Sequence, residues 1–428
     1  MKKKPEEVFT PRAFDVNPAM YMARPDLEAA LANALRGDKQ VIVHGESGSG
    51  KSWLYKKVLS DQDHECLVVD FANASRFQSV TKEFENVVAR NERALHTGYT
   101  EAKEASIGAF GTGGKLNHAD TYKLESKEPF ERCLEFIRQR AGKKRGATIV
   151  LDNFERIMNS QPLIKELADL LALSDNRDYA QYRVKLLVVG VPSDLRSYFS
   201  RVDQQNTIAN RLTEVPEVSR LEREQVAEFV TRGFVDELGV AVDGPDLYGI
   251  IEHIAWVTDG IPQQLHEYCY ELALIAERNA GTLIEDDCEE ADVCWLKTAL
   301  TSSYTAVEAS MNSRSTVAGR RNQTIFAIGL CQRSEFKYDD IEEIVRSEFP
   351  ESTSDKLLNV VQILSALAES DPPLIVRTPK GDAYRLVNPK YRMSIRTMLS
   401  KDASGNRVEK RELGTVTQDM LRDDPAVD

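Results

Sequence analysis

The sequence predicts an α/β protein built on a parallel β-sheet, followed by a helical region and a small C-terminal unit. Between residues 24 and 218, short β-branched or apolar runs alternate with amphipathic stretches, as expected for parallel strands buried on both faces. From residue 221 the apolar spacing becomes helical throughout. Residues 320–400 then read as three short helices and two strands joined by a glycine-containing turn.

Length and charge set the outer limits of this organisation. A chain of 428 residues suggests about three domains, and 42% hydrophobic residues allow ordinary cores. We place an α/β core at 1–220, a helical region at 221–318, a third domain at 319–400 and a disordered tail at 401–428. The net charge of −13 argues against a protein coated for nucleic acid, although a local basic patch remains possible.

Cysteine usage and hydropathy indicate the compartment. The six cysteines are scattered without a CxxC pair, so neither a disulfide framework nor a zinc site is expected. No apolar run is long enough to span a bilayer, and the basic start is not followed by the apolar region of a signal peptide. The sequence therefore predicts a cytoplasmic protein.

Residues 45–52 carry the motif G-x-x-x-x-G-K-S between an apolar strand, 40–44, and a stretch of helical spacing, 53–59. This is the pattern of a phosphate-binding P-loop, and a chance glycine-rich turn is the alternative. Its glycines let backbone N–H groups point at phosphate oxygens, while Lys51 supplies a cation for the β- and γ-phosphates and the Ser52 hydroxyl ligates Mg²⁺. The predicted nucleotide contacts are Gly45, Glu46, Ser47, Gly48, Ser49, Gly50, Lys51, Ser52 and Trp53.

A second motif is the apolar run 147–151 ending in Asp152, which is the Walker B pattern. A strand running beside the P-loop strand would place this carboxylate near Mg²⁺, where it holds the metal's water shell. Hydrolysis also needs a group that orients the attacking water. Glu155 is the next carboxylate and the candidate for that role; the alternative is a surface ion pair with Arg156.

Two further features have open interpretations. Arg211 precedes the last expected strand, 213–218, where a planar cation could act as a finger on a neighbour's γ-phosphate, or it is an ordinary surface arginine. The glycine-rich stretch 106–115 lacks the spacing of a second P-loop. It is either a flexible insertion or a mobile hairpin that contacts a partner.

Three helices followed by a hairpin form a winged-helix pattern in residues 319–400. The expected recognition helix, 355–368, is nearly all apolar with a single Lys356, which is a poor match for a major-groove reader. The wing and the segment after it are basic and could contact phosphates. We favour protein or intramolecular contact, with DNA as the alternative; the basic residues are Arg377, Lys380, Arg385, Lys390, Arg392 and Arg396.

Taken together, these motifs resemble the AAA+/STAND branch of P-loop ATPases, especially initiator-like and KAP-like members with a winged-helix tail. Residues 45–52 and Asp152 match Walker A and Walker B, residues 152–156 resemble the D-x-x-[DE]-R pattern, and Arg211 matches the finger position. Residues 24–28 look like the helix that lines the adenine, which makes Arg24 a nucleotide contact. The resemblance makes 221–318 the lid, but Gln263 and Gln264 occupy the positions of the usual sensor-2 arginine.

The resemblance implies an ATP- and Mg²⁺-dependent switch that assembles with copies of itself or with a partner protein. The first hypothesis is a regulatory ATPase with slow hydrolysis at a subunit boundary, in which Lys51, Asp152, Glu155 and Arg211 do the chemistry. The second is a winged-helix DNA-binding ATPase of replication, transposition or transcription control. The third is a nucleotide-locked scaffold that does not turn over.

Overall fold

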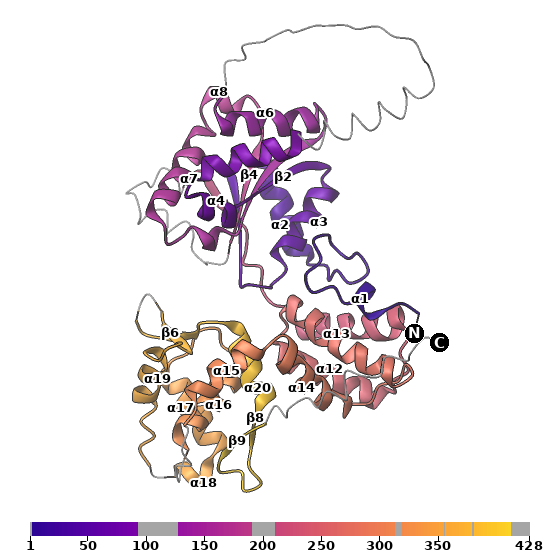
Figure 1. The fold of residues 1–428 in the computed structure, drawn as a ribbon, viewed down its shortest axis with the longest axis vertical. Helices are drawn as coiled ribbons and strands as arrows, with labels where there is room; N and C mark the ends of the chain where they lie inside the picture. Colours follow the sequence, from indigo (N-terminus) through magenta and orange to yellow (C-terminus); the bar gives the residue numbers. More distant parts are fainter. Residues whose placement is uncertain are drawn as a thin grey trace, which may run out of the picture. The chain divides into compact units, whose positions relative to one another are not determined.

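The computed structural model describes residues 2–92, 127–190, 210–312, 319–354, 356–378 and 381–411 (Figure 1). The chain divides into two compact units: a core unit of residues 14–16 and 21–219, and a C-terminal unit of residues 1–13, 17–20 and 220–428. The glycine-rich stretch 106–115 lies outside the described residues, as does Lys380.

The core unit is built on a five-stranded sheet of order β2-β3-β4-β1-β5 in which every neighbouring pair is parallel. The P-loop strand β1 pairs with β4 and β5, and β3, which ends at Asp152, pairs with β2 and β4. The expectation that the Walker B strand runs beside the P-loop strand is therefore wrong, because β4 lies between them. The strands are β1 Gln40–His44, β2 His64–Asp70, β3 Gly146–Asp152, β4 Lys185–Gly190 and β5 Leu212–Glu214.

Helices cover both faces of this sheet, which accounts for the near-continuous apolar strands (Figure 1). Successive β1 residues alternate between the two layers: Val41 and Val43 pack with α2 and α3, and Ile42 packs on the opposite side with α6 and α7. The helices are α2 Pro25–Arg36, α3 Lys51–Asp61, α4 Phe71–Phe77, α6 Pro129–Ala141, η1 Phe154–Arg156, α7 Gln161–Leu173 and α8 Arg177–Ala180, together with helical residues 80–92.

The C-terminal unit is mainly helical. Its first part comprises α1 Pro5–Val8, α11 Arg223–Thr231, the π-helical η2 Arg232–Leu238, α12 Gly244–Thr258, α13 Pro262–Arg278, α14 Asp287–Thr298 and α15 Thr301–Ser310. Its second part comprises α16 Arg320–Leu330, α17 Tyr338–Glu348, α18 Pro350–Thr353, α19 Val360–Ala368, β6 Ile375–Arg377, β7 Tyr384–Leu386, α20 Pro389–Met398, β8 Leu399–Lys401 and β9 Val408–Lys410.

The order of elements in the second part is the expected one: α16, α17 and α19 precede the antiparallel pair β6–β7. The strands β8 and β9 form a second antiparallel pair that extends beyond residue 400. The prediction that disorder begins at residue 401 is therefore wrong. In the part of the chain that the structure describes, no helix combines the length and the apolar character needed to cross a bilayer.

Residues 1–13 belong to the C-terminal unit, so the predicted core boundary of 1–220 is wrong at its N-terminal end. Phe9 is buried, and its ring lies 5.9 Å from that of Phe229 and 5.0 Å from that of Phe234. The Thr10 N–H donates to Nδ1 of buried His266 at 3.1 Å. The Thr10–His266 hydrogen bond requires a neutral imidazole, because Nδ1 of His266 is the acceptor.

We expect this unit to lose stability on mild acidification. Burial lowers the pKa of His266 to about 3, whereas an unfolded histidine titrates near 6.5. Since the unfolded chain binds the proton first, the contribution of His266 is complete above about pH 6.5 and falls by about 1.4 kcal/mol per pH unit below it, down to about pH 3.

Urea unfolding between pH 7 and pH 4 measures this effect. In a Trp53→Phe background, tryptophan emission comes from Trp256 and Trp295, both in the C-terminal unit. The variant His266→Gln keeps an acceptor for Thr10 but has no titrating ring, so its stability should depend less on pH. Equal pH slopes with and without His266 would contradict the expectation.

Candidate nucleotide-binding site

The turn between β1 and α3 has the backbone that a phosphate cradle needs. Gly45, Gly48 and Gly50 have φ angles of 151°, 81° and 91°, a region that favours glycine. A Cβ at Gly45 would also lie 2.4 Å from the Val218 carbonyl oxygen, so no larger residue fits there. The three glycines are thus required by backbone shape, independently of any ligand.

Lys51, the first residue of α3, is held by the turn itself. Its Nζ donates to the carbonyl oxygens of Gly45 at 3.0 Å and Glu46 at 2.7 Å. Burial lowers the pKa of Lys51, while the nearby carboxylates of Glu155 and Asp152 oppose that shift. The Lys51 amine therefore lies near two carboxylates. Its two hydrogen bonds to the turn are both to backbone carbonyls, and phosphate oxygens can replace these acceptors.

The other predicted P-loop contacts line the same turn. Ser47 is exposed, Ser52 and Trp53 are partly buried in the first turn of α3, and the buried Ser49 hydroxyl has no hydrogen-bond partner. An unpartnered buried hydroxyl inside the glycine turn is consistent with a polar ligand that completes it.

Asp152 is at the end of β3, and both of its carboxylate oxygens are occupied by neutral donors. Oδ1 accepts from the Asn153 backbone N–H at 2.9 Å, and Oδ2 accepts from the Tyr55 hydroxyl at 3.3 Å. Burial raises the pKa of Asp152, and these two hydrogen bonds counteract the rise. Asn153 has a left-handed backbone, φ 63°, and its side chain donates to Asp70 at 2.9 Å, which fixes the chain just after the carboxylate.

Glu155 lies on the short helix η1 and is partly buried. Its charge acts on both Lys51 and Asp152, so the three groups share one site. The alternative of a surface pair with Arg156 finds no support, because the structure describes both side chains and records no ion pair between them. The orientation of an attacking water by Glu155 stays a prediction.

Arg24 makes contacts that the sequence did not suggest. Its Nη2 donates to the Ser49 carbonyl at 2.9 Å and its Nη1 to the Ser219 carbonyl at 3.1 Å. One guanidinium thus joins the P-loop to the last residues of the core unit. The expected contact of Arg24 with adenine remains a prediction. The sequence feature that could have indicated its link to the P-loop is its position at the start of α2, where the Arg24 N–H donates to Glu28 at 2.8 Å.

Arg211 is far from the P-loop along the sheet. It directly precedes β5, whose first residue, Leu212, pairs with Gln40 at the start of β1, whereas the P-loop follows the end of β1. Its guanidinium forms an ion pair with Asp175. Arg211 therefore does not join this chain's own site, and a finger role toward a neighbouring subunit stays a prediction.

The residues fit a Mg²⁺–nucleotide complex. The glycine turn and Lys51 match a chain of phosphates, and the Ser52 hydroxyl and the Asp152 carboxylate are oxygen ligands of the kind that Mg²⁺ uses alongside phosphate. Among the described residues there is no cluster of three histidine, cysteine or acidic side chains able to bind a metal alone.

We expect Arg24→Ala to loosen the P-loop. The carbonyls of Ser49 and Ser219 would each lose a donor, so ATP affinity should fall about five-fold, the usual worth of one net hydrogen bond. Arg36→Ala is the matched control, because Arg36 ends the same helix and contacts Gln62 at the surface.

Calorimetry with ATP and with inorganic tripolyphosphate measures this effect. A loss for both ligands supports the P-loop contact. A loss confined to ATP would instead support the adenine contact and contradict the expectation.

Comparisons with known proteins agree with this geometry. Residues 35–199 match the model of the AAA domain family. A Walker-type ATPase of Pyrococcus abyssi has a similar fold, at 18% identity and TM-score 0.52, over 90% of this chain and 99% of that one. The ORC2 protein of Aeropyrum pernix in its ADP form aligns at 14% identity and TM-score 0.48, over 92% and 96%. A sequence comparison with curated proteins returned no match. The core unit thus has the P-loop ATPase fold, and its residues 35–199 are similar to the AAA domain family.

Proposed function

We propose that this protein is a Mg²⁺-ATP-dependent regulatory ATPase of the AAA+/STAND type that acts as an oligomerising switch. The observation that carries the proposal is the grouping of Lys51, Asp152 and Glu155 around the glycine turn. The pattern of residues 152–156 supports the KAP-like assignment. A finger role of Arg211 toward a neighbouring subunit is part of the proposal, since Arg211 lies away from this chain's own P-loop edge.

The site's own residues account for ATP hydrolysis to ADP and phosphate. Lys51 leaves the carbonyls of Gly45 and Glu46 and binds the β- and γ-phosphates, and the turn's N–H groups surround them. Bound Mg²⁺ supplies charge neutralisation at these phosphates, with Ser52 and Asp152 as its protein partners. Glu155 orients a water toward the γ-phosphorus and accepts its proton.

Two substitutions separate binding from hydrolysis. Lys51→Ala removes charge-assisted bonds worth about 1.5–3 kcal/mol, so ATP affinity should fall about tenfold or more. Glu155→Gln should bind ATP normally and lose about 10²–10⁴-fold in phosphate release, the usual contribution of a general base. Lys57→Ala is the control, since Lys57 lies on the same helix and pairs with Asp61.

Mass measurement with ATP and Mg²⁺ tests assembly in the same variants. We expect an ATP-dependent rise in mass for the parent protein and none for Lys51→Ala. Normal ATP binding and turnover by Lys51→Ala would overturn the proposal. Normal binding without turnover by the parent would favour the nucleotide-locked scaffold.

The role of the C-terminal unit depends on its basic residues, and three of them are used internally. Asp259, at the end of α12, accepts from Arg392 at 2.7 Å and Arg396 at 3.2 Å and also pairs with Arg220. Although burial alone would raise it, these arginines hold the pKa of Asp259 below its usual value. A second ion pair joins the Lys390 amine of α20 to the Glu267 carboxylate of α13 at 3.0 Å. These ion pairs connect α20 to α12 and α13, so the three basic residues Lys390, Arg392 and Arg396 contact the protein interior rather than solvent.

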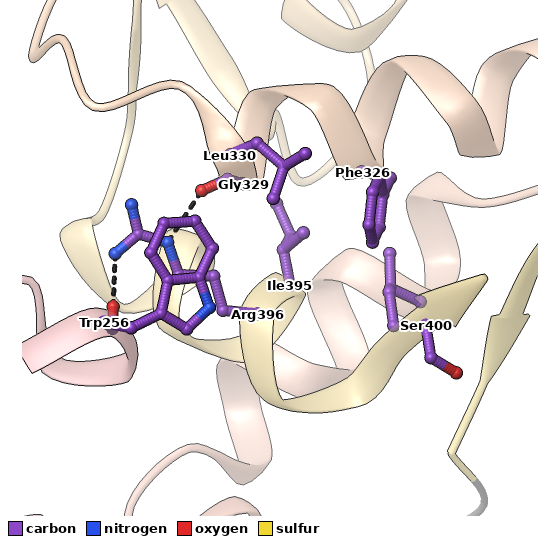
Figure 2. Close-up of a pocket in the computed structure, with 8 residues that line it drawn as sticks. Trp256, Phe326, Gly329, Leu330, Ile395, Arg396 and Ser400 are labelled. Carbon is purple, nitrogen blue, oxygen red and sulfur yellow. Dashed lines mark hydrogen bonds between the residues drawn. The ribbon is translucent and has the colours of Figure 1, made fainter. Parts of the chain in front are cut away.

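Arg396 also stacks on an aromatic ring. Its guanidinium lies 3.8 Å from the Trp256 ring centroid and donates to the carbonyl oxygens of Trp256 and Gly329 (Figure 2). A cavity of about 160 Å³ lies beside this pair. Its lining is mostly apolar and consists of Trp256, Phe326, Gly329, Leu330, Ile395, Arg396, Leu399 and Ser400.

Helix α19, the expected recognition helix, exposes apolar side chains. It begins at Val360, later than expected; Leu357, just before it, is 91% exposed and Val361 is 52% exposed. Of the wing residues that the structure describes, Arg377 and Arg385 face solvent. Among the described residues of α19 and the wing, one apolar helix face and two exposed arginines give few contacts for a phosphate backbone. These features support intramolecular or protein contact over DNA.

We therefore expect weak duplex binding at most. Fluorescence anisotropy with labelled duplex at 50 mM and 200 mM salt measures it, for the parent protein and for Arg377→Ala combined with Arg385→Ala. The parent and the double variant should bind equally weakly. Tight binding that falls steeply with salt and is lost in the double variant would favour the DNA-binding alternative.

A further inference from the structure

Tyr55 is a core residue of α3 that touches the proposed metal site. It is 1% exposed and packs in the apolar layer between α3 and the sheet. Its hydroxyl nevertheless donates to Asp152 Oδ2 at 3.3 Å. Ser52 and Tyr55 are three residues apart on α3, so they lie on one face of this helix.

The phenol is not explained by packing. Phenylalanine would fill the same apolar space, whereas a buried hydroxyl costs about 1–3 kcal/mol unless it is hydrogen-bonded. The bond to Asp152 provides that partner, so the hydroxyl and the carboxylate oxygen are matched. The strand order makes the contact non-trivial, because Asp152 ends β3 while α3 follows β1, and β4 lies between those strands.

The chemistry of the donor also matters. Asn153 N–H and Tyr55 O–H each take one lone pair of the Asp152 carboxylate, which leaves further lone pairs for other donors. Both donors are neutral, so they orient the carboxylate without cancelling its negative charge. A lysine or arginine in place of Tyr55 would neutralise Asp152 and repel a divalent cation.

We propose that Tyr55 is a positioning residue that orients Asp152 Oδ2 toward the water shell of nucleotide-bound Mg²⁺. The inference rests on the proposed function, because it assigns a role within the same site. The proposed role of Tyr55 affects how much Mg²⁺ nucleotide binding needs. Binding of the phosphates themselves is assigned to the glycine turn and Lys51.

Tyr55→Phe tests the assignment, since it removes one oxygen atom and keeps the packing. The probe is mant-ATP, whose binding is followed by fluorescence in EDTA and then during titration with MgCl₂. We expect affinity in EDTA within about two-fold of the parent, and a rise of about five-fold in the Mg²⁺ concentration needed for half of the metal-dependent signal.

Tyr21→Phe is the matched control. Its hydroxyl donates to Glu28 at 2.9 Å in the same unit and does not touch Asp152, so its Mg²⁺ requirement should equal that of the parent. Thermal unfolding reports any loss of packing in either variant.

The possible results distinguish the role of Tyr55 from the proposed ATP-dependent function. An unchanged Mg²⁺ requirement in Tyr55→Phe overturns the role of Tyr55 and leaves the proposed function standing. An equal loss of affinity with and without Mg²⁺ also overturns it, because that is the result of a purely structural contact. A parent protein that does not bind mant-ATP overturns the proposed function, and the role of Tyr55 with it.

Discussion

The close approach of Gly45 to the segment after β5 constrains the arrangement of the core unit. Val218 lies against this glycine, and its N–H donates to the His44 carbonyl at 2.8 Å. Arg24 adds a second connection by binding Ser49 and Ser219 together. The turn that would hold phosphate and the chain that leaves the core unit therefore share hydrogen bonds, so a shift in one is felt directly by the other.

Two aspartates show how surroundings assign different roles to one residue type. Asp152 is partly buried, both of its hydrogen-bond donors, Asn153 N–H and Tyr55 O–H, are neutral, and burial raises its pKa. Asp259 is partly buried among three arginines, which lower its pKa, and it joins α20 to the end of α12. The first arrangement suits a partner for an incoming metal, and the second suits a structural connection that needs no ligand.

Local features of the sequence were sufficient for the P-loop. Its glycines, Lys51 and the flanking strand and helix are contiguous, so spacing alone located them. The parallel sheet followed in the same way from the apolar runs. The strand order did not, because the position of β4 between β1 and β3 depends on pairing between segments far apart in the chain.

Side-chain partners were equally hidden. Arg392 and Arg396 belong to a basic segment, which suggested phosphate contact, but their carboxylate partner Asp259 lies more than 130 positions away. Tyr55 has the spacing of an ordinary core residue, and nothing in its neighbours points to Asp152. In each case the missing information was a long-range contact that composition and periodicity do not carry.

The assignment of residues 1–13 to the C-terminal unit has a consequence for how this protein can be divided or inherited. No single cut separates the two units: cleavage after Ser219 would leave Phe9 on the fragment that carries the sheet and strip Phe229 and Phe234 of their covering ring. An exchange of the C-terminal half between related genes would meet the same obstacle. The two ends of the chain must therefore be retained as a pair, although more than 200 residues of a different unit separate them.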